Sequence, residues 1–153
     1  MQNAAAARAR FLADAVATAS PAKLLTMLYD RLVLDLSRAE RAQAVGDRSA
    51  ANVQLQHAQD VVTELHSSLD TTGASGWSGA AGLASLYSFL ASELVEANIS
   101  GEAARTAACR ELVEPLREAW HAAAQAAVAQ SAPATSLVPA QRAATPSLIS
   151  VSA

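Results

Sequence analysis

The sequence predicts an all-α protein, an antiparallel up-down four-helix bundle with a short N-terminal segment or helix capping it and a disordered C-terminal tail. Hydrophobic residues make up 52% of the chain but aromatic residues only 4%, and the abundant alanines suit closely packed helices better than a β-sandwich. Apolar residues recur at helical spacing in segments joined by mostly short connections. We expect a mobile N-terminal cap segment over residues 1–19, a bundle over 20–128 and a disordered tail over 129–153.

The first long helix has a well-marked start and end. Ser20 can accept a hydrogen bond from a free backbone N–H of the first turn, and Pro21 suits the first helical position because it has no N–H to leave unpaired. The helix is predicted to end near Ala44, since Gly46 can adopt the left-handed conformation that follows a helix. Its apolar stripe is wider than packing on one helix requires, and it contains Leu24, Leu25, Leu28, Tyr29, Leu32, Val33 and Leu36.

Three further helices are predicted from apolar periodicity, over about 49–69, 80–99 and 102–128. Leu112, Leu116, Trp120 and Ala123 form the apolar edge of the last one. A connection rich in Gly, Ser and Thr precedes the third helix of the bundle, and its Trp77 is expected to tuck onto the bundle end as a lid, with contact to a partner as the alternative.

Prolines shape the C-terminal part of the chain. Pro115 lies inside the last predicted helix, where it removes a hydrogen bond, so we expect a kink rather than a break because the apolar seam resumes at Leu116. Prolines at 133, 139 and 146 predict that the tail is disordered. At the other end, residues 1–19 read as a helix too short to be stable alone, which either docks on the bundle or frays.

The composition excludes several classes of function. A net charge of −3 and a pI near 5.5 leave no basic footprint for nucleic acid. Charged residues interrupt every long apolar run, so we expect neither membrane insertion nor a secretory signal, and a cytoplasmic location. The single cysteine, Cys109, cannot form an intramolecular disulfide.

No arrangement of residues indicates catalysis or a cofactor. His57, Asp60 and Glu64 share one helix face, but a metal site in a bundle needs inward ligands from several helices, so this face is interpreted as solvated. Neither His66 nor His121 neighbours a nucleophile in a recognisable arrangement, and no Gly-rich loop could cradle a phosphate. We therefore predict no metal, no cofactor and no enzyme activity.

Several different short motifs follow one another along the chain. The first contains Thr18, Ala19, Ser20, Pro21, Leu24, Leu25, Met27, Leu28, Tyr29 and Asp30. Later ones are Gly46-Asp47, Ala58-Gln59-Asp60 through Glu64-Leu65 to Ser67-Ser68-Leu69-Asp70, Leu86-Tyr87, Ala97-Asn98-Ile99 and Leu116-Arg117-Glu118-Ala119-Trp120. Over about residues 11–125 this pattern resembles the flagellar secretion chaperones of the FliS family. The chain departs from that pattern at Phe11, where relatives typically have Tyr, and at Arg31, where they often have Gly.

The resemblance implies a function and two partners. Such a chaperone binds the disordered C-terminal region of flagellin one-to-one, prevents premature polymerisation and keeps flagellin competent for flagellar type III secretion. When loaded with flagellin it engages the export gate protein FlhA, and when free it is a monomer. The N-terminal segment would lie over part of the flagellin groove and move aside on binding.

An apolar groove between helices can recognise an amphipathic helical segment of a partner. Tyr29 and Tyr87 each flank a leucine seam, and a phenol suits a half-wet groove where the ring packs and the hydroxyl stays hydrated. The alternative is that both tyrosines rim the core and bind nothing. The residues predicted to line the flagellin groove are Phe11, Val16, Leu24, Leu25, Leu28, Tyr29, Leu32, Tyr87, Leu90 and Leu94.

Two other functions fit the same bundle. One is a regulatory protein that binds a different protein helix, as an anti-sigma factor does. The other is a structural bundle that self-associates through its exposed leucines and tyrosines. A self-associating bundle would dimerise without a client, and a regulator would ignore flagellin.

Overall fold

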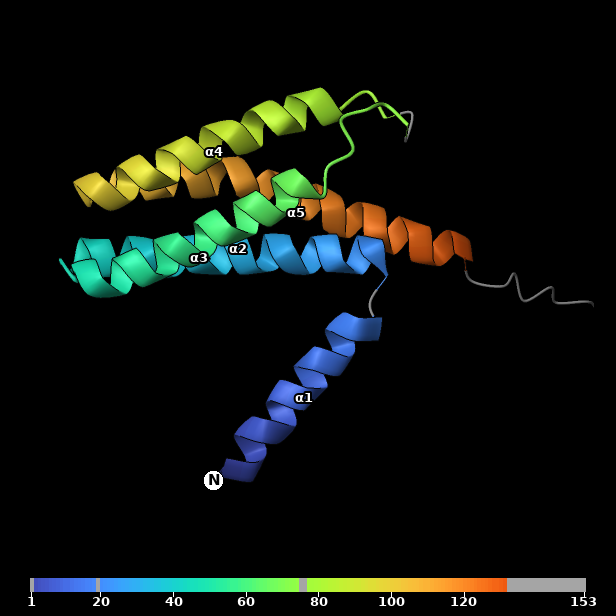
Figure 1. The fold of residues 1–153 in the computed structure, drawn as a ribbon, viewed down its shortest axis with the longest axis horizontal. Coiled ribbons are helices and arrows are strands. Elements are labelled where there is room, and N and C mark those ends of the chain that lie inside the picture. Colours follow the sequence, from blue (N-terminus) through green and yellow to red (C-terminus); the bar gives the residue numbers. More distant parts are fainter. Residues whose placement is uncertain (1, 19, 75–76, 132–153) are drawn as a thin grey trace, which may run out of the picture.

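The computed structural model describes residues 2–18, 20–74 and 77–131, which form five α-helices and no strand (Figure 1). The helices are α1 (Gln2–Thr18), α2 (Pro21–Ala44), α3 (Arg48–Ser67), α4 (Ala80–Ser100) and α5 (Ala103–Ser131). The predicted all-α class is confirmed. None of the helices in this described part is both long and apolar enough to cross a membrane.

Helices α2 to α5 lie side by side around one apolar core. α2 packs against α3 and α5, and α4 packs against the same two helices, so α2 and α4 lie diagonally opposite each other (Figure 1). The α4–α5 pair makes the least extensive contact of the four neighbouring pairs. The largest fully buried side chains of the core are Tyr29, Tyr87, Leu32, Leu36, Leu55, Leu65, Leu90, Leu94, Val62 and Val113.

The predicted cap residues begin and end α2. Ser20 Oγ accepts a hydrogen bond from the Lys23 backbone N–H at 3.2 Å, which satisfies one of the free donors of the first turn. Gly46 has a φ of 74°, and its N–H donates to the Gln43 carbonyl at 3.0 Å. Asp47 then caps α3 by accepting from the Ala50 N–H at 2.9 Å. The positive φ of Gly46 and the side-chain cap of Asp47 therefore define the short turn between α2 and α3.

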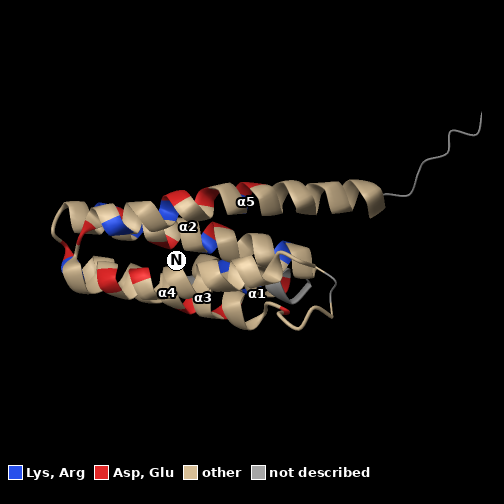
Figure 2. Ribbon diagram, turned by 90° about the horizontal axis from the view of Figure 1, so that it is seen from above, with Lys and Arg blue, Asp and Glu red and all other residues tan. Residues whose placement is uncertain are grey.

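α5 runs unbroken through Pro115, as expected, and continues to Ser131, beyond the predicted end at Val128. Its last part reaches past the ends of the other helices (Figure 2). From Ala119 to Ser131 it contains no Lys, Arg, Asp or Glu. The rest of the predicted tail, 132–153, lies outside the described residues.

α1 is a helix, but it makes no extensive contact with α2 to α5 and projects from the bundle (Figure 1). Its Phe11 and Leu12 side chains are exposed, Phe11 by 73%. The structure therefore shows the predicted helical segment without the predicted cover over a groove. That such a segment covers the flagellin groove stays a prediction.

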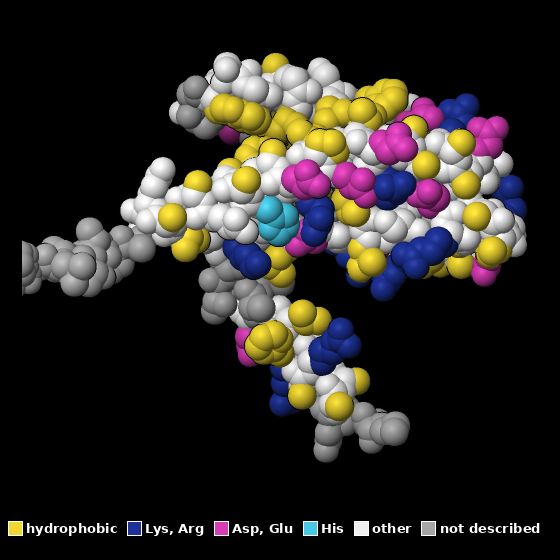
Figure 3. Space-filling view, turned by 180° about the vertical axis from the view of Figure 1, so that it is seen from behind, with side chains coloured by type: hydrophobic (Ala, Val, Ile, Leu, Met, Phe, Trp, Pro, Cys, Tyr) yellow, Lys and Arg dark blue, Asp and Glu magenta, His cyan; other side chains and the backbone are white. Residues whose placement is uncertain are grey.

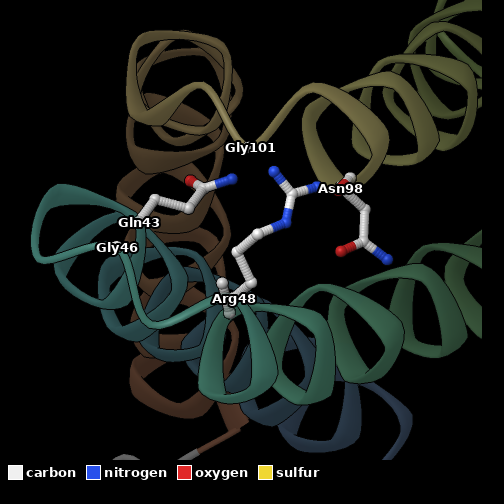
Figure 4. A pocket seen from close by; sticks show the side chains of 6 residues that line it. Gln43, Gly46, Arg48, Asn98 and Gly101 are labelled. Atoms are coloured by element: carbon white, nitrogen blue, oxygen red, sulfur yellow. Dashed lines mark hydrogen bonds between the residues drawn. The ribbon is translucent and has the colours of Figure 1, made fainter.

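A polar latch closes the end of the bundle where α2 meets α3 and α4 meets α5 (Figure 4). Arg48 Nη2–H donates to the Ile99 carbonyl at 2.9 Å, and Gln43 Nε2–H donates to the Ala97 carbonyl at 3.0 Å. Carbonyls in the last turn of a helix have no partner within that helix, so these side chains complete the end of α4. The small pocket among them is therefore interpreted as a capped helix end rather than a ligand site.

Gly101 is the residue of this latch that cannot easily be replaced. It has a φ of 74°, and a Cβ there would lie 2.8 Å from Arg48 Nη1. We expect Gly101→Ala to lower the free energy of unfolding by about 1–2 kcal/mol, because alanine is strained at positive φ and would displace the guanidinium. Urea denaturation measures the change.

Gly82→Ala is the matched control, because Gly82 lies in α4 and nothing is within 4 Å of the Cβ it would gain. We expect this change to be stabilising by about 0.5 kcal/mol, since alanine favours a helix. Equal effects of the two substitutions would contradict the special role of Gly101.

Candidate protein-binding groove

Two tyrosine hydroxyls meet in the middle of the core. Tyr29 Oη of α2 and Tyr87 Oη of α4 are 2.6 Å apart and share a hydrogen bond, although α2 and α4 are diagonal helices. The side chains are 0% and 2% exposed. The prediction that these phenols are hydrated in a half-wet groove is therefore wrong. Both lie in the core because each hydroxyl supplies the partner that the other needs away from water.

The Tyr87 phenol stays neutral. Burial raises the pKa of Tyr87, and the hydrogen bond with Tyr29 raises it further, because both favour the protonated phenol. Aromatic neighbours surround the pair: the Trp120 ring is 6.4 Å from Tyr29, and the His66 ring is 6.2 Å from Tyr87. The pair thus ties rings from all four bundle helices into one cluster.

The residues predicted to line the flagellin groove separate into three groups. Leu24, Leu25 and Leu28 are half-buried along α2, and Phe11 is exposed on the projecting α1. The Val16 side chain lies outside the described part of α1. The fully enclosed group consists of Tyr29, Leu32, Tyr87, Leu90 and Leu94.

The structure brings this last group together inside the bundle rather than on its surface. A truncation such as Tyr29→Ala would therefore remove core packing, and it cannot serve as a probe of binding alone. Contact of any predicted residue with flagellin stays a prediction.

An open apolar groove instead lies between α4 and α5. It has a volume of about 630 Å³, and Figure 3 shows hydrophobic side chains gathered along this seam. Its lining residues are Trp77 from the connection before α4, Leu83 from α4, and Leu116, Ala119, Trp120 and Ala123 from α5. We call this the α4–α5 groove. It exists because the two helices pack least closely here and the facing α5 side chains at 119 and 123 are only methyl groups.

Further apolar side chains continue the same seam towards the latch. Phe89 of α4 is 51% exposed and Leu112 of α5 is 44% exposed. Leu112 precedes Leu116 by one helical turn, so both lie on the edge of α5 that faces α4. An ion pair between Glu93 and Arg105, with Oε1 and Nη1 2.6 Å apart, closes the far end.

A second groove flanks α5 on its other side, next to the start of α2. It has a volume of about 710 Å³. It is lined by Ser20, Pro21, Ala22 and Lys23 of α2 and by Ala124, Ala127, Val128 and Ser131 of α5. We call it the α2–α5 groove. The last part of α5, which contains no Lys, Arg, Asp or Glu, therefore has an apolar groove on either side.

The sequence pattern identified the apolar edge of α5 but did not show that part of this edge is open to solvent. Leu116 and Trp120 are indeed partly buried against the core, whereas Ala119 and Ala123 are exposed. Helical periodicity shows which residues share an edge, but it cannot show how far away the neighbouring helix lies. The motif from Leu116 to Trp120 was the signal in the sequence that could have identified the groove, because it contains three of the α5 residues that line it.

A charged cluster holds α5 to α2 beside these grooves. Asp30 Oδ1 accepts hydrogen bonds from Arg117 Nε and from His121 Nε2, the latter at 2.8 Å. Burial raises the pKa of Asp30, but the hydrogen bonds and charges of His121 and Arg117 outweigh it and hold the pKa below its ordinary 3.8. The ionised carboxylate thus contributes to stability.

Asp30→Asn tests this contribution. The folded protein binds the Asp30 proton more weakly than the unfolded chain, so the stabilisation is present above the unfolded pKa of about 3.9 and is lost as the pH falls through the folded pKa. We expect a loss on the order of 1 kcal/mol at neutral pH, kept small by solvent screening because the Asp30 side chain is 41% exposed.

Thermal unfolding followed by circular dichroism from neutral pH to below about pH 4 measures the difference between Asp30→Asn and the unchanged protein. The difference should shrink in the acid range. A gap that stays constant with pH would contradict the assignment to this carboxylate.

The polar face of α3 is solvated, as predicted. His57, Asp60 and Glu64 are exposed, and His57 Nδ1 lies 2.9 Å from Arg31 Nη2 of α2. Arg31 Nε–H also donates to buried Asp35 at 3.0 Å. Within the described ranges, no group of three or more His, Cys, Asp or Glu could hold a metal ion.

Two comparisons with known proteins point the same way. Residues 1–127 match the family model described as flagellar protein FliS. The flagellar secretion chaperone FliS of Bacillus subtilis (strain 168) is 29% identical over 112 residues, which cover 73% of this chain and 81% of that protein. The family match spans α1 to α4 and most of α5, and so includes every helix that lines the two grooves.

Proposed function

Because this chain belongs to the FliS family of flagellar proteins, we propose that it is an export chaperone for flagellin. It binds the disordered C-terminal region of flagellin one-to-one, prevents premature polymerisation and keeps flagellin competent for flagellar type III secretion. The name of the Bacillus subtilis relative supports a secretion chaperone, and a chaperone of this kind catalyses no reaction.

The proposal includes the finer architecture and the setting. α2 to α5 form an antiparallel up-down four-helix bundle, which is supported by the short α2–α3 and α4–α5 turns and by the pairing of each helix with the next. The free protein is a monomer in the cytoplasm. Once loaded with flagellin, it engages the export gate protein FlhA.

The observation that carries the proposal is the pair of apolar grooves along the uncharged end of α5. An amphipathic helix can place its apolar anchors into a groove of this kind. Flagellin that is disordered before binding loses chain entropy when it folds, so it needs a long apolar contact to compensate. Two grooves of about 630 and 710 Å³ on one helix offer such a contact.

The residues assigned to this contact are those that solvent can reach. From the predicted set they are Phe11, Leu24, Leu25 and Leu28, and the α4–α5 groove adds Ala119 and Ala123. The enclosed members of the set would meet flagellin only if the bundle helices parted. We therefore assign them to the folded framework that supports the grooves.

Titration calorimetry with flagellin from the same cell tests the function. We expect one-to-one binding to full-length flagellin and none to flagellin without its C-terminal segment. Ala123→Glu should weaken binding at least tenfold, because the new carboxylate lies in an apolar groove and loses its water when flagellin covers it.

Ala122→Glu is the matched control, since Ala122 is exposed on the same helix and lines neither groove. It should leave the affinity unchanged. Absence of heat with both forms of flagellin would overturn the chaperone function. Equal losses for the two variants would remove the α4–α5 groove from the site, and dimerisation without flagellin would favour the self-associating alternative.

A further inference from the structure

The Trp77 side chain, from the loop before α4, lies at one end of the α4–α5 groove. Its ring lies edge-on to Trp120, with the centroids 6.0 Å apart and the planes at 68°. This is a favoured aromatic geometry. Yet Trp77 remains 44% exposed, so the groove receives the ring without enclosing it. Trp77 therefore packs on the bundle, as the sequence predicted for a lid, but about half of its side chain stays in solvent.

The absence of a side chain at Gly79 leaves the space that the Trp77 ring fills. A Cβ at Gly79 would lie 2.3 Å from Trp77 Cζ2 and 2.6 Å from Trp77 Cε2, closer than two non-bonded carbon atoms can approach. Gly79 is also the N-cap of α4, where it supplies no side-chain hydrogen bond, whereas Ser20 and Asp47 cap α2 and α3. The N-cap position of α4 thus holds a residue that makes no side-chain cap but leaves room for the indole.

Trp120 packs against the core as well as against Trp77. It packs against Tyr29 of the core, with ring centroids 6.4 Å apart. Trp120 Nε1–H is buried, and no residue in the described ranges accepts a hydrogen bond from it. An unpaired buried donor is unfavourable, so Trp120 is held in place by its packing rather than by a hydrogen bond.

We propose that Trp120 is the anchor subsite of the α4–α5 groove, and that Trp77 fills it in the free protein as a substitute for a client side chain. The occupant is an aromatic or long aliphatic side chain on an amphipathic helical segment of flagellin. On binding, this side chain packs on Trp120 and displaces Trp77 into solvent. This inference rests on the proposed function.

Three features of the molecule support displacement rather than direct contact. The indole already shows that a large ring fits against Trp120. The connection between Ser67 and Ala80 is the longest between bundle helices, so Trp77 can move without moving a helix. The rest of the groove is lined by leucine and alanine side chains, which suit the apolar face of a helix.

The two tryptophans of the chain give a direct readout, because coupled indoles at this distance produce an exciton couplet in far-ultraviolet circular dichroism, on top of the helical signal. We expect the signal in the free protein to disappear when full-length flagellin is added. Gly79→Ala should abolish it without flagellin, because the new Cβ expels the ring. Gly82→Ala, elsewhere on α4 with nothing near its Cβ, should keep it.

Calorimetry then separates competition from contact. If Trp77 competes with the client, Trp77→Ala and Gly79→Ala should each tighten flagellin binding by at least about threefold, since a larger fraction of molecules is open. Adding Gly79→Ala to Trp77→Ala should change nothing further. A cooperative urea unfolding transition checks that each variant folds, and the backbone angles at Gly79 (φ −78°, ψ −12°) suit alanine.

Several results would overturn the inference. An exciton signal that persists in the complex would show that Trp77 stays in place. Weaker or unchanged binding by Trp77→Ala would show that the ring contacts flagellin itself or plays no part. Absence of any binding by the unchanged protein is a different result, because it removes the proposed function and the anchor subsite with it.

Discussion

The hydrogen bond between Tyr29 and Tyr87 is the constraint on which the rest of the bundle depends. It joins α2 to α4, which are diagonal and otherwise meet through the apolar core and through the hydrogen bond from Gln43 to the Ala97 carbonyl at one end of the bundle. A buried hydroxyl is costly when unpaired, so each tyrosine requires the other at one height along the bundle. The bond therefore fixes the register of two helices that no short turn connects. The Tyr29 ring of this pair also packs against Trp120.

Consecutive residues of α2 then position α5 from two directions. Tyr29 meets Trp120 on the core side, while Asp30 meets Arg117 and His121 nearer the surface. α5 is thus held firmly to α2 and more loosely to α4. The looser side is where the α4–α5 groove opens. In this structure these contacts place α5 against α2, and the two apolar grooves lie on either side of α5.

Much of this fold could be predicted from local sequence, and the site could not. Ser20, Pro21 and Gly46 act within a few residues of themselves, so the limits of α2 follow from capping rules. Periodicity places Tyr29 on the apolar side of α2, but it does not show that Tyr87, far along the chain, points at the same spot. The pairing removed both phenols from the predicted groove.

The apolar edge of α5 was identified, but its partial exposure was not, because the distance between α5 and α4 is set by tertiary packing. The most direct test of this account is to measure the unfolding free energy and the flagellin affinity of Tyr29→Phe, Tyr87→Phe and the double variant. Each single change should cost about 1–3 kcal/mol by leaving one hydroxyl unpaired, the double variant should cost less than their sum, and affinity should not change. Full stability with lost affinity would contradict it, because the tyrosines would then serve binding rather than the framework.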